Sequence, residues 1–382
     1  MRSIAITTKD FAGPVLGKAT RNGVPKTARR DYVFIADHNN LDDCKGYLAI
    51  LTLQGSEDAR LRRKRAPTAY AARRLDEIND GDIVLLEPEK GSLTVLYATK
   101  SRHNAMLITE RCNCSCVMCP QPPRRDERPL TATNRRLIQL MAPGPEVLAL
   151  TGGEPTLVWN DLLSLVTECA TKLPETRLAL LTNGRVFRNV RLVEQLVSVG
   201  HRNLLLAVPL YSDIDSIHDT IVGAEGAFGD TVRGLHNLAA YRVPVELRTV
   251  LLRENYQRLP QFVEFIYRNL PFVDHTAIMG LEPTGLAEAN LNRVWVDPYD
   301  AKEQLLAACT YLHRRLIPNA LYNLQLCVVP SELWAVARRS ISDWKNVYLP
   351  ECEGCDVKHQ CGGFFRSGID HHSAHIAPIK RP

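Results

Sequence analysis

The sequence lacks long apolar runs. No segment approaches the roughly 18 consecutive apolar residues of a transmembrane helix, so no membrane span is predicted. The first ten residues also lack the apolar stretch and small-residue cleavage pattern of a secretory signal. We therefore expect a cytosolic protein without membrane contact.

A strong excess of one charge is also missing. The chain has 47 basic and 42 acidic residues and a formal charge of +5, which gives no reason to expect nucleic-acid binding. The basic excess is concentrated in two short runs, made of Arg60, Arg62, Arg63, Lys64 and Arg65, and of Arg124, Arg125 and Arg128. Such runs are usually solvated loops, and contact with an acidic peptide segment is the alternative.

Cysteine, in contrast, is abundant and clustered. The chain has eleven cysteines, and disulfides are not expected in a reducing compartment. Seven of them fall into two tight groups: Cys112, Cys114, Cys116 and Cys119, and then Cys352, Cys355 and Cys361. This grouping indicates metal or Fe–S ligation rather than scattered core thiols.

The length of 382 residues fits two or three domains. Residues 1–100 predict a small, mostly-β domain, with strands at Asp31–Ala36, Tyr47–Leu53, Asp82–Glu87 and Ser92–Tyr97 and one helix at Ala69–Ile78. Residues 296–370 predict helices at Ala301–Leu316 and Ser331–Ile341 and then a cysteine-rich region. Residues 371–382, which include His371, His372 and His375, are expected to form a mobile tail rather than a metal site.

Residues 101–295 alternate between short apolar runs and amphipathic stretches. The predicted strands are Ala105–Thr109, Val147–Leu150, Leu178–Leu181, Leu204–Val208, Val245–Leu252 and Thr276–Met279. The predicted helices are Thr131–Met141, Leu157–Leu173, Val190–Val199, Thr231–Tyr241 and Gln257–Asn269. Six such units predict an α/β fold with a parallel sheet and outer helices, in the form of an open, partial (β/α)6 barrel.

Unusual residues follow the predicted strands at their carboxyl ends, where a parallel β/α barrel gathers its reactive groups. They are Cys112–Cys119, Thr151–Pro155, Thr182–Gly184, Tyr211 with Ser212, and Glu282. We therefore expect these groups to share one site.

The pattern Cys112-x3-Cys116-x2-Cys119 places three thiolates in one loop. Three cysteines leave one iron of a four-iron cubane open to a small ligand. The spacing resembles the signature of the radical SAM superfamily, in which S-adenosylmethionine (SAM) chelates that iron and is cleaved by one electron to a 5′-deoxyadenosyl radical. A zinc site with Cys114 as a fourth ligand is the alternative, but it does not explain the neighbouring motifs.

The resemblance also implies the SAM contacts. Met118 is expected to pack on adenine and Cys114 to be a bystander. Gly152-Gly153-Glu154 matches the GGE motif, whose carboxylate can accept from the SAM ammonium. Asn183 and Ser212 match polar positions that touch SAM, although a turn or cap role explains them equally well. Arg248 and Glu282 are expected at the cavity or in a structural ion pair.

Cys352-x2-Cys355-x5-Cys361 resembles the auxiliary-cluster region of SPASM and twitch domains, although Phe365 stands where the SPASM pattern has a further cysteine. The resemblance implies one auxiliary [4Fe–4S] cluster, for which Cys327 is the best fourth ligand. Cys309, His359 and a tail histidine are rivals, and a four-ligand zinc knuckle remains an alternative.

Four segments narrow the resemblance to the C-type radical SAM maturases of the His-Xaa-Ser repeat systems. They are 112–123, 150–157, 281–287 and 352–365. This resemblance implies a ribosomally made precursor peptide with His-Xaa-Ser repeats, a partner radical SAM maturase and an external electron donor. A radical SAM enzyme acting on a small molecule or another protein side chain, and a non-catalytic Fe–S or zinc scaffold subunit, are the alternatives.

Overall fold

The structure is a computed structural model that describes residues 2–36, 44–54, 67–71, 75–124, 129–141, 143–339 and 346–380. The basic run 60–65, Arg125 and Arg128 lie outside the described residues, so the structure does not test the prediction of acidic-peptide contact there. Within the described part, no helix is both long and apolar enough to cross a membrane.

The N-terminal region is a closed seven-stranded barrel with the strand order β1-β5-β4-β3-β2-β6-β7. Its strands are β1 (Arg2–Lys9), β2 (Val15–Thr20), β3 (Tyr32–Ile35), β4 (Ala49–Leu53), β5 (Thr68–Ala71), β6 (Ile83–Glu87) and β7 (Ser92–Tyr97). A separate apolar core that includes Val33, Leu51 and Leu86 fills this barrel. The four expected strands are confirmed, but the predicted helix Ala69–Ile78 is wrong: Thr68–Ala71 form β5, which pairs with β1 and β4.

The second region contains an eight-stranded sheet in which every pair of neighbours is parallel and the strand order follows the chain from β8 to β15. Its strands are β8 (His103–Thr109), β9 (Val147–Gly152), β10 (Arg177–Leu181), β11 (Leu204–Pro209), β12 (Val245–Val250), β13 (His275–Met279), β14 (Asn319–Tyr322) and β15 (Ala337–Arg338). All six expected strands are confirmed. β14 and β15 were not expected from the sequence. The predicted helix Ser331–Ile341 is wrong over its described residues, which form a short 3-10 helix at Ser331–Leu333, turns, and the two-residue strand β15.

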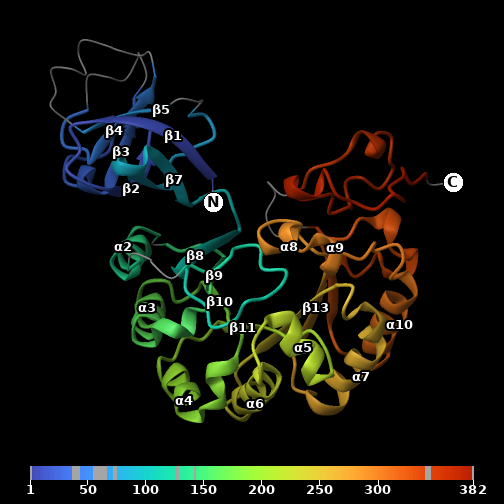
Figure 1. Cartoon of the computed structure of the whole chain (residues 1–382). Coiled ribbons are helices and arrows are strands. Elements are labelled where there is room, and N and C mark those ends of the chain that lie inside the picture. Colours follow the sequence, from blue (N-terminus) through green and yellow to red (C-terminus); the bar gives the residue numbers. More distant parts are fainter. Residues whose placement is uncertain are drawn as a thin grey trace.

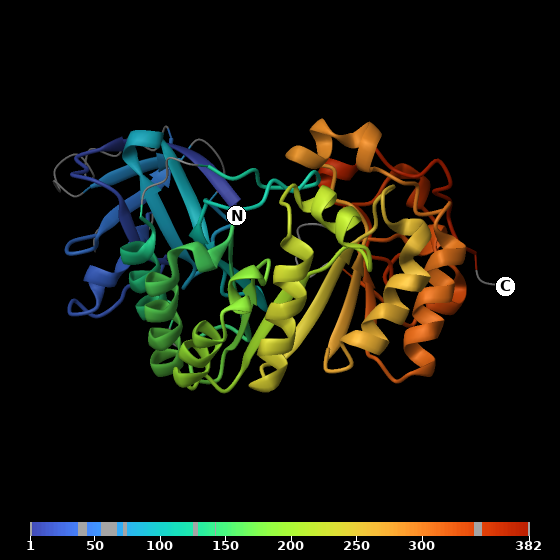
Figure 2. The ribbon, with the colours of Figure 1, turned by 60° about the horizontal axis from the view of Figure 1, so that its bottom comes forward.

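Helices connect these parallel strands, and most of the helices lie on the outside of the sheet (Figure 2). They are α2 (Thr131–Met141), α3 (Trp159–Lys172), α4 (Val190–Ser198), α5 (Asp215–Val222), α6 (Ala227–Ala240), α7 (Leu259–Asn269), α8 (Leu286–Ala289), α9 (Leu291–Val294) and α10 (Lys302–Arg314). In contrast to the others, α8 and α9 pack on the loop that follows β8. The five helices predicted between the strands and the one predicted at Ala301–Leu316 are confirmed with small shifts at their ends.

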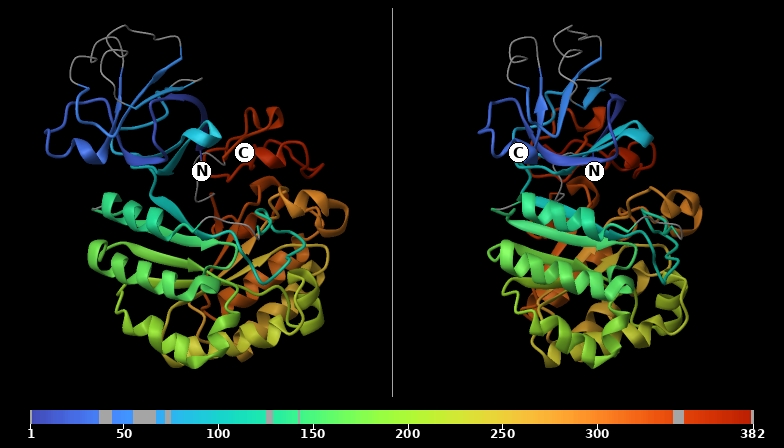
Figure 3. Two further views of the ribbon diagram at one scale, coloured as in Figure 1. Left: turned by 60° about the vertical axis from the view of Figure 1, so that its left-hand side comes forward. Right: turned by 90° about the vertical axis from the view of Figure 1, so that its left-hand side faces the viewer.

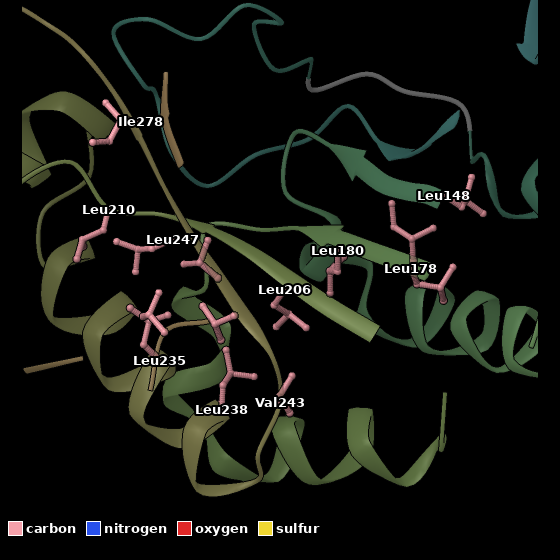
Figure 4. Close-up of a cluster of buried hydrophobic side chains, with 14 of the residues drawn as sticks. Leu148, Leu178, Leu180, Leu206, Leu210, Leu235, Leu238, Val243, Leu247 and Ile278 are labelled. Atoms are coloured by element: carbon pink, nitrogen blue, oxygen red, sulfur yellow. The ribbon is translucent and has the colours of Figure 1, made fainter. Parts of the chain in front are cut away.

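Successive side chains of a strand point to opposite faces of the sheet. On the central strands, leucines point to the helix side and form the main core there. Leu180 and Leu206 are fully buried in the main core, together with Leu235 and Leu238 of α6 (Figure 4). Burying a leucine side chain contributes about 2 kcal/mol, so this layer stabilises the sheet–helix packing. The intervening positions include Ala179 and Ala207, which line interior cavities instead.

The N-terminal barrel and the C-terminal residues lie on the same side of the parallel-sheet region (Figures 1 and 3). The barrel is attached through an ion pair between Asp31 and Arg136 and through Ile83, which joins the main core. The expectation of a mobile C-terminal tail does not hold for residues 371–380. There, His371 packs edge-on against Trp295, and His375 stacks on Tyr299 with ring centroids 3.7 Å apart.

Candidate functional site

The loop that carries the first cysteine group begins where β8 ends and is tied to two other elements. The amides of Ser115 and Val117 donate to the carbonyls of Val222 and Ile221 at the end of α5, at 2.9 Å in both cases. On the other side, the amide of Leu286 at the start of α8 donates to the Cys119 carbonyl at 2.8 Å. These bonds hold the loop backbone from two sides.

Two glycines let neighbouring segments approach this loop. A Cβ atom on Gly153 would lie 2.2 Å from the Arg111 carbonyl oxygen, and one on Gly285 would lie 2.6 Å from the Pro120 carbonyl oxygen. Gly285 also has a φ of 62°, a left-handed conformation that favours glycine. Gly153 of the GGE motif therefore allows close contact with the backbone that leads into the cysteine loop.

Glu154 is only 1% exposed and joins the ends of three strands. Its Oε1 atom accepts from the Thr156 amide, the Thr156 hydroxyl and the Thr182 hydroxyl at 3.0, 2.7 and 2.8 Å. Its Oε2 atom accepts from the Asn183 amide at 2.6 Å, and its own amide donates to the Arg111 carbonyl. Burial raises the pKa of Glu154, and these hydrogen bonds oppose that rise.

The strand ends enclose a cavity of about 1310 Å³ that is open to solvent. Its lining brings together most of the residues that the sequence analysis placed in one site: Cys112, Cys114, Cys116, Met118, Cys119, Gly152, Gly153, Glu154, Asn183, Arg248 and Glu282. The predicted convergence of these groups at the carboxyl ends of the strands is therefore confirmed as geometry.

The thiols of the loop lie close enough to affect one another electrostatically. Burial, together with the nearby Cys114 and Cys119, raises the pKa of Cys116 to about 12. Contact between Cys112 and Cys114 raises the pKa of Cys112 and lowers that of Cys114, which the Arg185 guanidinium also favours as a thiolate. Burial disfavours ionisation of thiols in the protein alone. The irons of a bound cluster would stabilise the thiolates, because thiolates are their ligands.

Ser212 and Arg248 differ in part from their expected roles. Ser212 is fully buried, does not line the cavity, and accepts from the Ile214 amide at 3.1 Å, as a turn residue does. Arg248 lines the cavity and also donates to Glu246 at 2.6 Å, so it combines both roles that the sequence left open.

The second cysteine group forms its own small cavity of about 330 Å³. Cys327, Cys352, Cys355 and Cys361 all line it. The C-terminal segment closes one side, because the Ile379 amide lies 3.4 Å from the Cys355 sulfur and donates to it.

The rival ligands of this second group lie elsewhere. Cys309 is buried in the main core on α10, and His359 contacts Gln360 outside the cavity lining. His371 and His372 line a different, aromatic cavity with Trp295 and Phe364. Cys327 is therefore the rival that lies with the other three cysteines.

In the described ranges, no three His, Cys, Asp or Glu side chains are grouped tightly enough to hold one metal ion. A cubane has a different requirement, because each of its irons takes a separate thiolate and the sulfurs stand further apart than the ligands of one ion. Four sulfur donors around one cavity fit such a cluster better than they fit a hard cation such as Mg²⁺.

Sequence reasoning missed several residues that shape the first site. Tyr211 is not one of these, because the sequence placed it at this edge: it lines the cavity, and burial and the nearby cysteines raise its pKa well above the usual value. Arg185 pairs with Asp230 at 3.0 Å and reaches the Cys114 sulfur at 3.8 Å. The position of Arg185 directly after Thr182-Asn-Gly184 was the available signal, whereas nothing near Asp230 indicated this contact.

Comparison with family models finds a match over part of the chain. Residues 106–266 match the model of the radical SAM superfamily. Curated relatives include a GTP 3′,8-cyclase of Synechococcus elongatus, 33% identical over 173 residues that cover 43% of this chain and 51% of the relative. They also include a PqqA peptide cyclase of Granulibacter bethesdensis, 24% identical over 162 residues and 41% of each chain, and an Fe-coproporphyrin III synthase of Methanosarcina barkeri, 28% identical over 42% of this chain and 39% of the relative.

The chain thus spans about half the length, or less, of these curated relatives. Among solved structures, Streptococcus suis SuiB bound to S-adenosylmethionine aligns over 58% of this chain and 50% of that chain, with 17% identity and a TM-score of 0.48.

Proposed function

Because residues 106–266 form a radical SAM superfamily domain, we propose that this protein reductively cleaves SAM and uses the resulting radical to modify a ribosomally made peptide. The observation that carries the proposal is the single cavity lined by Cys112, Cys116, Cys119 and Glu154. Three thiolates at an open cavity leave the fourth corner of a cubane accessible to a small ligand.

Cys112, Cys116 and Cys119 would hold the [4Fe–4S] cluster, and the loop bonds to α5 and α8 fix their backbone. The bound cluster would supply one electron that splits SAM into methionine and a 5′-deoxyadenosyl radical, which takes a hydrogen atom from the substrate. The chain itself keeps the loop rigid through Gly153 and Gly285, so that the three sulfurs keep one arrangement.

Glu154, Met118 and Asn183 are the residues that we assign to SAM. Within the described part of the chain, the Oε2 atom of Glu154 accepts one hydrogen bond, from the Asn183 amide, and it has a further lone pair for the SAM ammonium. The Met118 side chain is 5% exposed and lines the cavity, where it can pack on adenine. Asn183 is held by Asn113 at 2.7 Å, which orients its amide at the cavity wall.

Cys327, Cys352, Cys355 and Cys361 would hold one auxiliary [4Fe–4S] cluster. Four thiolates in one cavity support this assignment, and a zinc ion held by the same four cysteines is the competing one. Such a cluster would accept the electron that remains after hydrogen abstraction and bond formation, or bind substrate. The amide of Ile379 would then serve as a hydrogen-bond donor to one ligand sulfur.

Two observations support the proposal of a peptide substrate. The segments 112–123, 150–157, 281–287 and 352–365 resemble the C-type maturases of the His-Xaa-Ser repeat systems, and one curated relative is named a PqqA peptide cyclase. The proposal therefore includes a His-Xaa-Ser precursor, a partner radical SAM maturase and an external electron donor. The modification would be a radical cross-link or a related change within the repeats.

A small-molecule substrate is the second candidate, because other curated relatives are named GTP 3′,8-cyclase and Fe-coproporphyrin III synthase. A non-catalytic scaffold is the third. The open-iron cysteine set and the buried Glu154 beside it argue against a scaffold, since neither is needed to bind a structural metal.

To test the peptide substrate, the genes beside this one are searched for a short reading frame that encodes His-Xaa-Ser repeats. Its product is incubated anaerobically with reconstituted protein, SAM, a reductant and the neighbouring radical SAM protein, and is then analysed by mass spectrometry. A mass loss of about two hydrogens within the repeats supports a cross-link. An unchanged peptide, in a reaction that does form 5′-deoxyadenosine, rejects this substrate and leaves SAM cleavage standing.

A further inference from the structure

A second large cavity lies at the opposite end of the parallel sheet, where β8 to β12 begin. Its volume is about 1260 Å³, and it is open to solvent. Residues from both edges of the sheet line it, so the sheet curls far enough for β8 and β15 to face one space. The lining comprises Lys100, Ser101, Arg102, His103, Val147, Arg177, Ala179, Leu205, Glu246, Arg248, Tyr322, Arg338 and Arg339.

Two alanines on the central strands leave room at the inner face of the sheet. Closed β/α barrels usually fill this space with layers of branched side chains. Here Ala179 on β10 lines the second cavity, and Ala207 on β11 lines the first. Arg248 lines both cavities and is held by Glu246, so this ion pair stands between them.

The lining is strongly cationic. Six lysine and arginine residues line the cavity, against the single carboxylate of Glu246, and one of them, Arg338, also donates to the Ala335 carbonyl at 2.6 Å. Glu246 is already paired with Arg248 at 2.6 Å and with His275 at 3.2 Å, and Arg102 lies 3.7 Å from Glu146 at the rim. A concave site lined by one sign of charge focuses its potential and attracts the opposite charge.

The cations are distributed around the mouth rather than gathered at one point. Lys100 and Arg102 precede β8, Arg177 begins β10, Arg338 ends β15, and Arg339 follows it. Between them lie apolar surfaces of Val147, Ala179 and Leu205 together with the ring of Tyr322. A compact phosphate needs converging donors, whereas this arrangement fits an extended chain that carries several carboxylates and some apolar atoms.

We propose that this cavity binds an acidic segment of a peptide, at the end of the sheet remote from the cysteine loop. The identification of the ligand as a peptide rests on the proposed function. The cavity and its positive charge are independent of that proposal. An acidic recognition segment held here would leave the remaining peptide free to reach the first cavity. Arginine suits this task, because its guanidinium pairs with carboxylates through two parallel hydrogen bonds.

The test is fluorescence anisotropy of a fluorescein-labelled hexaglutamate peptide, with full-length protein and no SAM. The test variant carries Lys100→Glu and Arg177→Glu. The matched control carries Arg191→Glu and Arg233→Glu, which make the same change in net charge at exposed positions on α4 and α6 outside the cavity. Circular dichroism confirms that each variant is folded.

We expect saturable binding that weakens as salt rises. The test variant should bind at least about tenfold more weakly, because each lost pair costs a few-fold and each new glutamate repels the probe. The control variant should bind within about twofold of the wild type. Saturable binding that both variants lose equally, or no binding at low salt, overturns the proposal.

A competition separates a peptide from a phosphate ligand. Unlabelled hexaglutamate should displace the probe at lower concentration than inorganic tripolyphosphate, and the reverse order overturns the assignment to a peptide. Formation of 5′-deoxyadenosine is measured on the same preparations. Because probe binding needs no SAM, failure of binding with intact SAM cleavage rejects this site alone, and the opposite outcome rejects the proposed chemistry alone.

Discussion

Gly153 offers a sharp test of how the structure holds the cysteine loop. In Gly153→Ala, the new methyl group would lie 2.2 Å from the Arg111 carbonyl oxygen, 2.6 Å from its carbon and 3.0 Å from the Glu110 carbonyl oxygen. All three are backbone atoms, so relief requires movement of the chain between β8 and Cys112. That movement would disturb two hydrogen bonds, from Gly153 to Thr109 at 2.8 Å and from Glu154 to Arg111 at 2.7 Å.

The cost follows from these contacts. Overpacking of a tight site costs about 1–3 kcal/mol, and each weakened hydrogen bond adds about 1 kcal/mol at most. We therefore expect the free energy of unfolding to fall by about 2–4 kcal/mol in Gly153→Ala. Because the strain falls on the cysteine loop, the iron bound after anaerobic reconstitution should fall by about half, as the first cluster is lost and the second group is untouched.

Gly229→Ala on α6 is the matched control, because nothing lies within 4 Å of the added methyl group. Alanine in a helix should leave iron binding unchanged and raise stability by up to about 1 kcal/mol. The measurements are urea unfolding followed by circular dichroism and iron content per chain. If Gly153→Ala binds wild-type amounts of iron and unfolds at the wild-type urea concentration, the role assigned to this glycine is wrong.

Three further predictions concern other parts of the site. Replacing Glu154 with Gln puts an amide where four donors converge, so SAM affinity measured by anaerobic titration should fall about tenfold or more, and unchanged affinity would remove Glu154 from the SAM site. Burial by itself raises the pKa of Glu246, but His275 and Arg248 lower it to about 2. The ionised Glu246 therefore stabilises the fold fully above the unfolded-state pKa of about 4.3, and this stabilisation is lost as the pH falls towards 2. Glu246→Gln should therefore remove about 3 kcal/mol of pH-dependent stability across that window, and a urea-unfolding profile as steep as that of the wild type would contradict it. Cys327→Ala should lower the iron content from about eight to about four per chain, whereas Cys309→Ala in the core should keep about eight, and equal values for both would exclude Cys327 as a ligand.

The parallel sheet could be predicted because its signals are local. Runs such as Leu178–Leu181 are continuous and apolar, as expected for strands buried on both faces, and turn residues bound them. The amphipathic period of helices such as α3 is likewise contained in each segment. The site followed from the same signal, since parallel strands place their carboxyl ends at one edge.

The errors arose where tertiary contacts override local preference. Thr68–Ala71 contains two alanines and favours a helix by propensity, yet β1 and β4 pair with it on both sides to close the barrel. β15 has only two residues and depends on pairing with β14, so no period could indicate it. For Ser212, a SAM contact and a turn role were equally consistent with the sequence. The hydrogen bond that Ser212 accepts from the Ile214 amide decides for the turn role, and no sequence pattern indicated it.

Formation of 5′-deoxyadenosine by the anaerobically reconstituted, reduced protein with SAM tests the central claim most directly. The wild-type protein should form it, and Cys116→Ala, which removes one of the three thiolates at the cavity, should form none and lose the first cluster. If the wild type, with about eight irons bound and both precursor and partner present, forms no 5′-deoxyadenosine, or if Cys116→Ala forms as much as the wild type, the account of this cavity is wrong.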